Sequence, residues 1–451
     1  MIYETDTYLE PYSKAIKGRH ERLLIRKGEI AGYGKRLTDA INNHLFYGVH
    51  REGDRWMFRE WAPNATSIYV VGDFNNWEIS PGYRMTNKGG GVWELMLPKK
   101  AVKHGDLFRL HIYWNGGDGE RLPSYATRCV QDSRTHQFSA QVWAPSRSYR
   151  WKNPRVPKVE NPLIYETHIG MASEEPVVAT FKDFTKNVLP RIAKLGYNTV
   201  QIMALQEHPY YGSFGYQVSN FFALSSRFGT PEEFKELVDK AHKLGLAVIM
   251  DIVHSHAVKN ELEGLSNFDG TKTLYFHAGD KGDHPAWGTR CFDYGKDETL
   301  YFLLSNCKYW MEEYNLDGFR FDGITSMLYW DHGLGRAFGG YEDYFNANVD
   351  VDTYFGGDKR VEAHNMLAEM GLWNPTNSIW PRCTLLEEDA EDFAFNYTDV
   401  SEVLTEYRAK FITGQLDIDA EWDNFQNKMK KLGIEEMQKA VQRAYDAYLG
   451  K

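Results

Sequence analysis

Two periodicities of hydrophobic and polar residues divide this chain of 451 residues. From about residue 46 to residue 148, segments such as WMFREW, SIYVVG and DLFRLHIYW alternate apolar and polar positions between turns rich in Gly, Asn and Pro. A period of two is typical of strands with one buried face, and many short strands in succession favour a sandwich. We therefore predict a β-sandwich domain over residues 46–149.

The segments on either side of the predicted sandwich follow other patterns. Residues 8–31 place apolar side chains at helical spacing, so we expect a helical lead-in within residues 1–45. Residues 150–161, RWKNPRVPKVEN, are rich in Pro and in basic side chains, which is typical of a linker.

After the linker, short apolar runs alternate with helical patterns. One of these patterns, PEEFKELVDKAHKLG, has Pro231 in its first turn and Gly245 at its end, as helices often do. Repeated strand–helix units imply a parallel sheet, and nearly continuous apolar strands imply burial on both faces. We predict an α/β fold with a TIM-type (β/α) barrel over residues 162–395. Its recognisable strands lie within residues 163–170, 198–203, 246–253, 317–323 and 383–389.

The barrel predicted in this way is incomplete. The residues after 390 are too few for three more β-α units of roughly 30 residues each. The tail EWDNFQNKMKKLGIEEMQKAVQRAYDAYLG instead has apolar residues at helical intervals on both sides of Gly433. We predict a helical segment over residues 396–451, and it resembles the C-terminal helices of bacterial extracellular sugar-binding proteins.

Polar residues occur where the predicted strands end, which is the face at which barrel enzymes place their active groups. In the fourth strand, Arg320 and Asp322 share one face while Phe319 and Phe321 are expected to pack on the other, because side chains alternate along a strand. A neighbouring guanidinium keeps a carboxylate ionised, which suits a nucleophile. A structural ion pair at the strand end is the alternative interpretation. The other strand-end residues are His168, Gln201, Asp251, His254, His256 and Glu388.

Asp322 and Glu388 follow consecutive predicted strands. Such neighbours could approach within the roughly 5–5.5 Å that separates the two carboxyl groups of retaining glycosidases. Asp322 would then be the nucleophile, and Glu388, shielded by a bound sugar, would keep its proton and act as acid/base. A solvated acidic strand end is the alternative for Glu388, with Glu387 and Asp389 beside it.

Composition limits the classes of molecule that this protein is expected to bind. The formal net charge is −10, and Lys and Arg form no stripe, which argues against nucleic acid and anionic membranes. Aromatic residues make up 15%, which fits sugar-stacking surfaces or an aromatic-rich core. Four scattered cysteines indicate reduced thiols and a cytoplasmic protein, and no apolar run is long enough to span a membrane. The HSH triplet at 254–256 is a weak zinc signal, so we expect neither metal nor cofactor.

Five motifs together resemble the glycogen or starch branching enzymes, which belong to glycoside hydrolase family 13 of the α-amylase clan. The resemblance runs from about residue 8 to about residue 345. The motifs are FREWAPNATSIYVVGDFNNW (58–77), IYETHIGM (164–171), EHPYYGSFGYQ (207–217), DIVHSHAVKN (251–260) and DGFRFDGITSMLY (317–329).

The resemblance implies a module like the family-48 carbohydrate-binding modules, followed by a barrel that cuts an α-1,4-glucan and rejoins the fragment through an α-1,6 bond. The implied partners are α-glucans such as glycogen, amylose and amylopectin, and we expect a monomer. Glu388 matches the acid/base if WPRCTLLEED is aligned on the strand-five pattern of the family. The residues carried over are Asp322 as nucleophile, Arg320 as its partner, Asp251 and His256 as sugar binders, Tyr216 as a stacking platform, and His168 and Gln217 as further substrate contacts.

The chain departs from the family pattern late in the barrel. No histidine follows His364, so the second transition-state aspartate, which His precedes in the family, has no counterpart. The histidine run near residue 330 is reduced to YWDHG, with His332, and the closing β-domain is absent. Two alternatives to a branching enzyme therefore stay open: a non-catalytic α-glucan-binding protein, and another hydrolase of the α-amylase clan.

Aromatic residues outside the strand ends have two interpretations. Trp77 and Trp93 could stack on glucan or fill the sandwich core. The long segment after the third barrel strand has aromatic residues for which we expect substrate contact, because loops at that barrel face commonly bind ligands. These residues are Phe268, Tyr275, Phe276 and Trp287.

Overall fold

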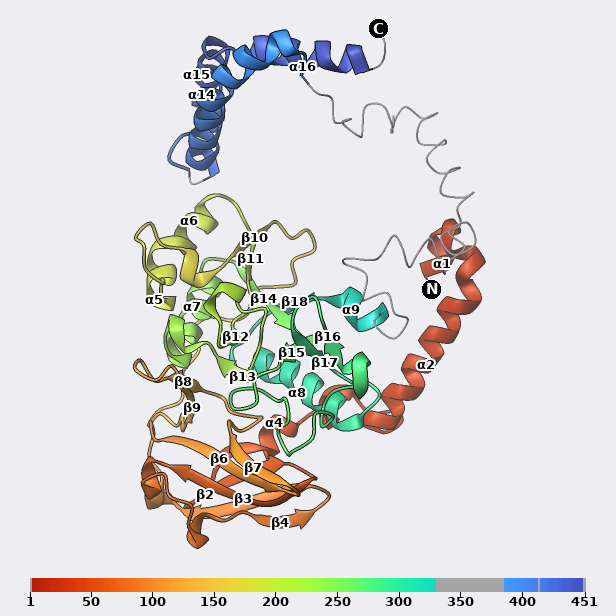
Figure 1. The fold of residues 1–451 in the computed structure, drawn as a ribbon, viewed down its shortest axis with the longest axis vertical. Coiled ribbons are helices and arrows are strands. Elements are labelled where there is room, and N and C mark those ends of the chain that lie inside the picture. The colour runs from red at the N-terminus through yellow and green to blue at the C-terminus, as the bar shows by residue number, and fades with distance from the viewer. Residues whose placement is uncertain (1, 330–384, 413, 449–451) are drawn as a thin grey trace. The chain divides into compact units, whose positions relative to one another are not determined.

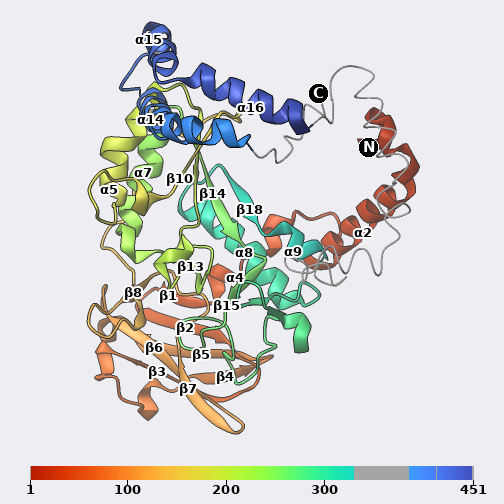
Figure 2. The same ribbon diagram turned by 45° about the horizontal axis from the view of Figure 1, so that its top comes forward.

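The computed structural model describes residues 2–329, 385–412 and 414–448, and these residues belong to two compact units. The first unit contains an N-terminal helical segment, a β-sandwich and a parallel sheet with its helices and loops (Figure 1). The second contains three helices near the C-terminus. Figure 2 shows the same elements from a second direction.

The N-terminal segment is helical. It consists of α1 (Ile2–Thr5), the 3₁₀-helix η1 (Thr7–Tyr12) and α2 (Ser13–Ala31), followed by α3 (Leu37–Ala40) and α4 (Asn43–Phe46). Tyr301 donates its hydroxyl to the Ile30 carbonyl, and Lys308 donates to the Thr38 carbonyl. The lead-in is thus attached to α8 (Asp297–Glu313) of the parallel-sheet domain.

The sandwich is present as predicted, with two antiparallel sheets. One has the order β1 (Gly48–Glu52), β2 (Arg55–Trp61), β5 (Val92–Pro98), β4 (Thr86–Gly89). The other has the order β3 (Ala65–Gly72), β6 (Leu107–Trp114), β9 (Phe138–Gln141), β8 (Cys129–Gln131), with β7 (Gly117–Arg121) paired to β6. Alternate residues of β3 and β6, among them Ile68, Val70, Leu110 and Ile112, are buried between the sheets.

Residues 150–161 contain neither helix nor strand, as expected of a linker, but they are held in place. The backbone N–H groups of Lys152 and Asn153 donate to the carboxylate of Asp239 on α7 (Pro231–Lys243). Arg121 and Asn64 of the sandwich also donate to residues 267 and 269 of the next domain. Sandwich and parallel sheet share one contiguous cluster of buried residues.

Four of the five predicted barrel strands form one parallel sheet. Its order is β10 (Ile164–Thr167), β11 (Thr199–Ile202), β14 (Ala247–Val253), β18 (Gly318–Asp322). The intervening helices are α5 (Phe181–Asp183), the π-helix η6 (Phe184–Val188), α6 (Leu189–Lys194), α7 and α8, and α9 (Ile324–Tyr329) follows β18. Thr230 and Glu233 form a reciprocal capping box at the start of α7, next to Pro231.

Two loops beyond the ends of the parallel strands have strands of their own. The loop after β11 contains β12 (Gln206–Glu207), the 3₁₀-helix η7 (Tyr211–Ser213) and β13 (Asn220–Leu224). The loop after β14 contains β15 (His256–Val258), β17 (Thr289–Cys291) and β16 (Asp283–His284), in this sheet order. Short 3₁₀-helices complete the set: η2 (Asp73–Asn75), η3 (Pro81–Tyr83), η4 (Lys99–Ala101), η5 (Ile169–Met171), η8 (Ser226–Phe228) and η9 (Gly279–Gly282).

The fifth predicted strand is wrong. Residues 383 and 384 lie outside the described residues, 385 and 386 are in neither helix nor strand, and Glu387 begins helix α14 (Glu387–Ile412). The run EEDAEDFA has no β-branched residue, and acidic residues in a first turn stabilise a helix through its dipole. His332 and His364 also lie outside the described residues.

The second unit is helical, in agreement with the pattern in the tail. After α14 come α15 (Ile418–Lys431) and α16 (Ile434–Tyr448), which pack around Val400, Val403, Met429 and Met437. Among the helices that the structure describes, none combines the length and the apolar character needed to cross a bilayer.

Candidate active site

The end of β18 carries the predicted ion pair. Arg320 donates from Nη1 to Oδ1 of Asp322 at 2.6 Å, so the two side chains share a face as expected. Phe319 packs against the core on the other face, and Phe321 is 40% exposed with its ring 5.8 Å from that of the buried His254. Within the described part of the sheet, β18 pairs only with β14.

Asp251, at the end of β14, is fully buried. Its carboxylate accepts hydrogen bonds from Gln201 Nε2 at 2.9 Å, Tyr216 OH at 2.6 Å and Arg320 Nη1 at 3.1 Å. Burial raises the pKa of Asp251, whereas the Tyr216 hydrogen bond and the Arg320 charge act against this rise. Asp251 therefore fixes the positions of Tyr216 and Arg320 together.

Tyr216 lies in the loop after β11, and the backbone turn before it requires a glycine. Gly215 has φ +89°, and a Cβ there would clash with the Ala204 carbonyl oxygen. Burial first, and then the hydrogen bond to Asp251, raise the pKa of Tyr216, so its hydroxyl stays protonated and donates.

His256 begins β15 and is held at both ring nitrogens. Its Nε2 lies 2.9 Å from the Tyr216 carbonyl oxygen, and its Nδ1 lies 2.9 Å from Ser255 Oγ. Burial lowers the pKa of His256 to about 4, so the ring is neutral at pH 7. Because a carbonyl only accepts, Nε2 carries the proton and Ser255 donates to Nδ1.

A cavity of about 300 Å³ lies at this edge of the sheet. It brings together four of the predicted residues, Asp322, Tyr216, Gln217 and His256, while Asp251 and Arg320 are not among its lining residues. Trp287, expected from its loop to contact substrate, also lines it. Ser213 and Ala286 were missed, because small residues in turns carry no periodic or charge signal. Asp322 is the one carboxylate among the lining residues that the structure describes.

His168 is not brought to this cavity. It follows β10 and is buried among the rings of Tyr211, Phe214 and Phe228, at centroid distances of 5.3–5.8 Å. Burial lowers the pKa of His168 to about 4. The structure therefore gives His168 a packing position, and His168 is not among the lining residues of the cavity.

Several aromatic residues expected to bind belong to the core instead. Trp93 is 3% exposed and donates its indole N–H to the Ala62 carbonyl, so its expected stacking on glucan is wrong for this fold. Phe268, Tyr275 and Phe276 are fully buried, so the expectation that they contact substrate is wrong. Trp77 differs, because it is 37% exposed and lies at φ +62°. Its indole N–H donates to Asp73, and the Arg109 guanidinium lies 5.6 Å from its ring.

Glu388 does not stand at a strand end. It lies exposed in the first turn of α14, within the second unit, and its neighbour Asp389 pairs with Arg443 of α16. The inference that made Glu388 a partner of Asp322 depended on consecutive strands, and that premise is wrong.

Family models match three parts of the chain. "Carbohydrate-binding module 48 (Isoamylase N-terminal domain)" matches residues 46–126, and "Alpha amylase, catalytic domain" matches residues 186–285. The 1,4-alpha-glucan-branching enzyme of Yarrowia lipolytica is 47% identical over 381 residues, which are 82% of this chain and 54% of that protein. Over most of its length, this chain is homologous to the 1,4-alpha-glucan-branching enzymes. The resemblance seen in the motifs is thereby confirmed.

Further branching enzymes give the same result. The branching enzyme of Aspergillus oryzae is 44% identical, and the match covers 86% of this chain and 56% of that enzyme. The branching enzyme of Equus caballus is also 44% identical, and the match covers 78% of this chain and 51% of that enzyme. The chain spans about half the length of the curated relatives it matches.

Solved structures agree on the fold class. A putative alpha amylase from Salmonella typhimurium superposes with a TM-score of 0.52 at 25% identity, covering 62% of this chain and 44% of that one. A pullulanase from Paenibacillus barengoltzii superposes with a TM-score of 0.53 at 20% sequence identity. The match covers 64% of this chain and 51% of the pullulanase chain. A sandwich module followed by an α-amylase-type partial barrel is therefore confirmed. The second unit matches a separate model, "Domain of unknown function (DUF3502)", over residues 387–450.

Proposed function

We propose that this branching-enzyme homologue is itself a 1,4-alpha-glucan branching enzyme, with Asp322 as its nucleophile. The observation that carries the proposal is the position of Asp322, which Arg320 holds at 2.6 Å on the wall of the 300 Å³ cavity. Among the described lining residues, aromatic and polar side chains surround one carboxylate, which suits a neutral sugar next to a nucleophile.

The proposed reaction is a double displacement. The Asp322 carboxylate attacks the anomeric carbon of an α-1,4-linked glucosyl unit, the glycosidic C–O bond breaks, and a glucosyl ester forms. A sugar 6-hydroxyl then attacks the same carbon and releases Asp322, while the group that gave up its proton in the first step takes the hydroxyl proton, which leaves an α-1,6 bond with overall retention. Arg320 holds the carboxylate in place through its hydrogen bond, and the buried Asp251 fixes Arg320.

An acid must protonate the departing oxygen in the first step. We do not assign that role to Glu388, because it is an exposed residue of helix α14 and not of a barrel strand. Transfer, as opposed to hydrolysis, further requires that an acceptor chain is positioned more effectively than water.

The proposed substrates are α-glucans such as amylose, amylopectin and glycogen. Trp77 is the residue of the sandwich that would stack on them, because its ring is exposed and a guanidinium lies beside it. We further propose a cytoplasmic monomer without a nucleic-acid or membrane partner, in keeping with the net charge of −10 and the scattered cysteines.

A second candidate is a protein that binds α-glucan without turnover. The observation that favours it is the cavity lining, in which the described residues supply only one carboxylate. Retaining hydrolysis or transfer normally requires two.

One experiment separates these functions. The chain is incubated with amylose, the products are debranched, and α-1,6 points and reducing ends are counted, with Asp322→Ala as the control. A branching enzyme gains α-1,6 points that disappear in the variant. A hydrolase of the same clan gains reducing ends alone, and retardation on a starch gel without any product would establish the non-catalytic binder and refute the proposal.

A further inference from the structure

Trp287 stands out among the aromatic residues of the long loop after β14. Phe268, Tyr275 and Phe276 of the same loop are fully buried, whereas Trp287 is partly exposed and lines the Asp322 cavity. It lies in the tight turn between β16 and β17, where its backbone N–H donates to the His284 carbonyl at 3.2 Å. The loop therefore turns one large aromatic ring towards the site and buries the others.

The indole ring is held in a defined plane. The His284 imidazole lies parallel to it, with ring centroids 4.0 Å apart and an interplanar angle of 2°. His284 is itself buried, and the His256 ring lies 5.0 Å away at 51°. Gln217 also donates its side-chain amide to the Trp287 carbonyl at 3.3 Å. Because His284 covers one face, the area that Trp287 contributes to the cavity comes from the remainder of the ring.

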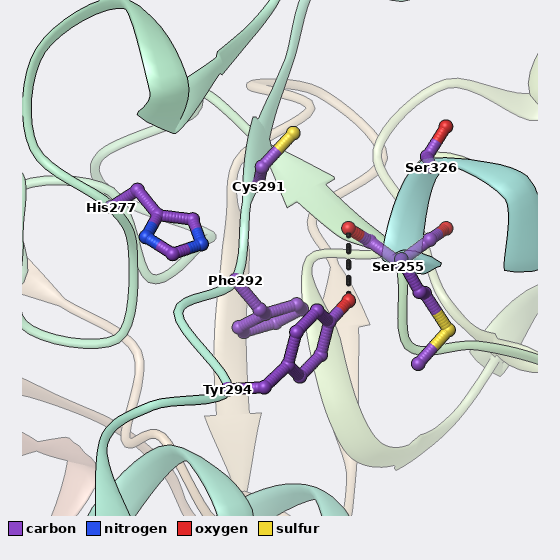
Figure 3. A pocket seen from close by; sticks show the side chains of 7 residues that line it. Ser255, His277, Cys291, Phe292, Tyr294 and Ser326 are labelled. Atoms are coloured by element: carbon purple, nitrogen blue, oxygen red, sulfur yellow. Dashed lines mark hydrogen bonds between the residues drawn. The ribbon is translucent and has the colours of Figure 1, made fainter. Parts of the chain in front are cut away.

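The support of this ring is connected to the nucleophile through a short stretch of chain. His284 Nε2 lies 3.2 Å from Ser326 Oγ, and Ser326 is on α9, four residues after Asp322. Figure 3 shows Ser326 and Ser255 at one small cavity of about 10 Å³, beside Cys291 and Tyr294. Ser255 in turn holds His256. The Trp287 ring is therefore supported through His284 by helix α9, which follows the strand that carries Asp322.

A flat aromatic ring beside a catalytic carboxylate has a direct use in carbohydrate recognition. The C–H face of a glucose ring is apolar and packs well on an indole, while its hydroxyl groups reach the polar side chains around it. The alternative is that Trp287 only covers His284 and His256 as part of the core. The partial exposure of Trp287 and its place in the cavity lining favour the first use.

We propose that Trp287 is a sugar-stacking residue of the Asp322 cavity in addition to Tyr216, that the cavity binds one glucosyl unit of an α-1,4-linked oligosaccharide, and that the His284–Ser326 contact fixes the plane of the Trp287 ring. The substrate class rests on the proposed function. Trp287 is thus a binding residue, and Ser326 is a positioning residue that acts through His284.

The test is maltotriose binding, measured by calorimetry on the full chain. A Trp77→Ala background removes the site proposed on the sandwich. In that background Trp287→Ala should weaken binding about tenfold, as expected for the loss of an aromatic stacking contact, and Trp287→Phe should weaken it about threefold. Trp151→Ala is the matched control, because Trp151 is also partly buried but lies outside the cavity lining, and its binding should not change.

A second measurement follows Trp287 directly and does not depend on the folding of Trp287→Ala. The chain is labelled with 5-fluorotryptophan, and the Trp287 resonance is identified by its absence in Trp287→Phe. Addition of maltotriose should shift this resonance. Ser326→Ala should reduce the shift and weaken binding about two- to threefold, whereas a merely structural role would leave the shift response unchanged.

The outcome is independent of turnover. If maltotriose binds and Trp287→Ala removes binding, the proposal holds even when amylose gains no branch points. If folded Trp287→Ala binds as tightly as its parent, or if the Trp287 resonance does not respond to maltotriose, the proposal is overturned even in an active enzyme. Absence of all maltotriose binding in the folded Trp77→Ala parent also overturns it.

Discussion

Residues 317–323 and 383–389 present similar apolar runs with acidic ends, yet they behave differently. The first run forms β18, whose two Phe residues alternate with Arg320 and Asp322. The second leads into helix α14, where Glu387, Glu388 and Asp389 occupy the first turn. Alternation of aromatic and charged residues specifies a strand, whereas consecutive acidic residues favour the start of a helix. Apolar character next to a carboxylate therefore does not identify a strand end by itself.

The largest effect should separate the two acidic residues by function. Asp322→Ala should lower glucan turnover at least about a thousandfold, because a nucleophile cannot be replaced by positioning alone. Glu388→Ala should leave turnover within about twofold of the parent, since Glu388 is exposed on α14. Branch-point counting on amylose measures the turnover of both variants. Equal losses of turnover would contradict a position of Glu388 outside the active site.

A buried strand carboxyl should show a pH dependence of stability. Glu60 of β2 accepts hydrogen bonds from Ser124 Oγ at 2.5 Å and from the backbone N–H groups of Ser124 and Trp61, and burial raises its pKa from 4.5 to about 7. The folded state therefore holds this proton more tightly than the unfolded state, so the stability contributed by Glu60 is present below pH 4.5 and is lost as pH rises towards 7 and above.

Glu60→Gln removes that dependence. Relative to the variant, the parent should lose about 3 kcal/mol of unfolding free energy between pH 4.5 and pH 8, at about 1.4 kcal/mol per pKa unit. Urea denaturation of both proteins at several pH values measures the difference. A difference that stays constant with pH, or that grows in the opposite direction, would contradict the buried position of Glu60.

The ion pairs of the two regions should differ in strength. Arg320→Leu leaves the fully buried Asp251 without its cationic partner, and we expect a loss of about 2 kcal/mol, reduced from the full cost of a buried pair because Arg320 is 44% exposed. Arg443→Ala, which breaks the pair with Asp389 in the helical unit, should have a smaller effect. Urea midpoints of the two variants give the comparison, and the reverse order would be inconsistent with the burial of Asp251.

Loss of one neutral donor to Asp251 should have a smaller effect than loss of Arg320. Tyr216→Phe removes the 2.6 Å hydrogen bond but keeps the ring in the cavity wall, so stability should fall by about 1–2 kcal/mol. Phe also keeps the surface on which a sugar can pack, so maltotriose binding should weaken only about twofold. Calorimetric binding and urea unfolding measure the two effects; unchanged stability would mean that Tyr216 does not support Asp251.

Local patterns predicted much of this molecule. Period-two alternation located β2, β3, β5 and β6, and four apolar runs located the parallel strands. Asp322 and Arg320 were predicted because a carboxylate and a guanidinium are chemically distinctive at a strand end, whereas Tyr216 was predicted through the motif resemblance alone.

The remaining features depend on tertiary contacts that no local pattern contains. Trp93 and Tyr275 look like exposed sugar platforms in the sequence, and only the packing of the sandwich and of the long loop shows that they are buried. Ser213 and Ala286 reach the cavity through the path of their loops and not through their chemistry. The acidic run at 387–389 follows apolar residues as a strand end would, but it begins helix α14, where acidic side chains in the first turn are stabilised by the helix dipole.

The central claim is that Asp322 forms a bond to the anomeric carbon of an α-glucosyl unit. Incubation with 5-fluoro-α-glucosyl fluoride supplies a leaving group that needs no acid and slows the second step, so the ester accumulates. Mass spectrometry of peptic fragments should find one added fluoroglucosyl group on the peptide that contains Asp322, and none in Asp322→Ala. A folded protein that gains no adduct, or that is labelled at another carboxylate, would contradict the account.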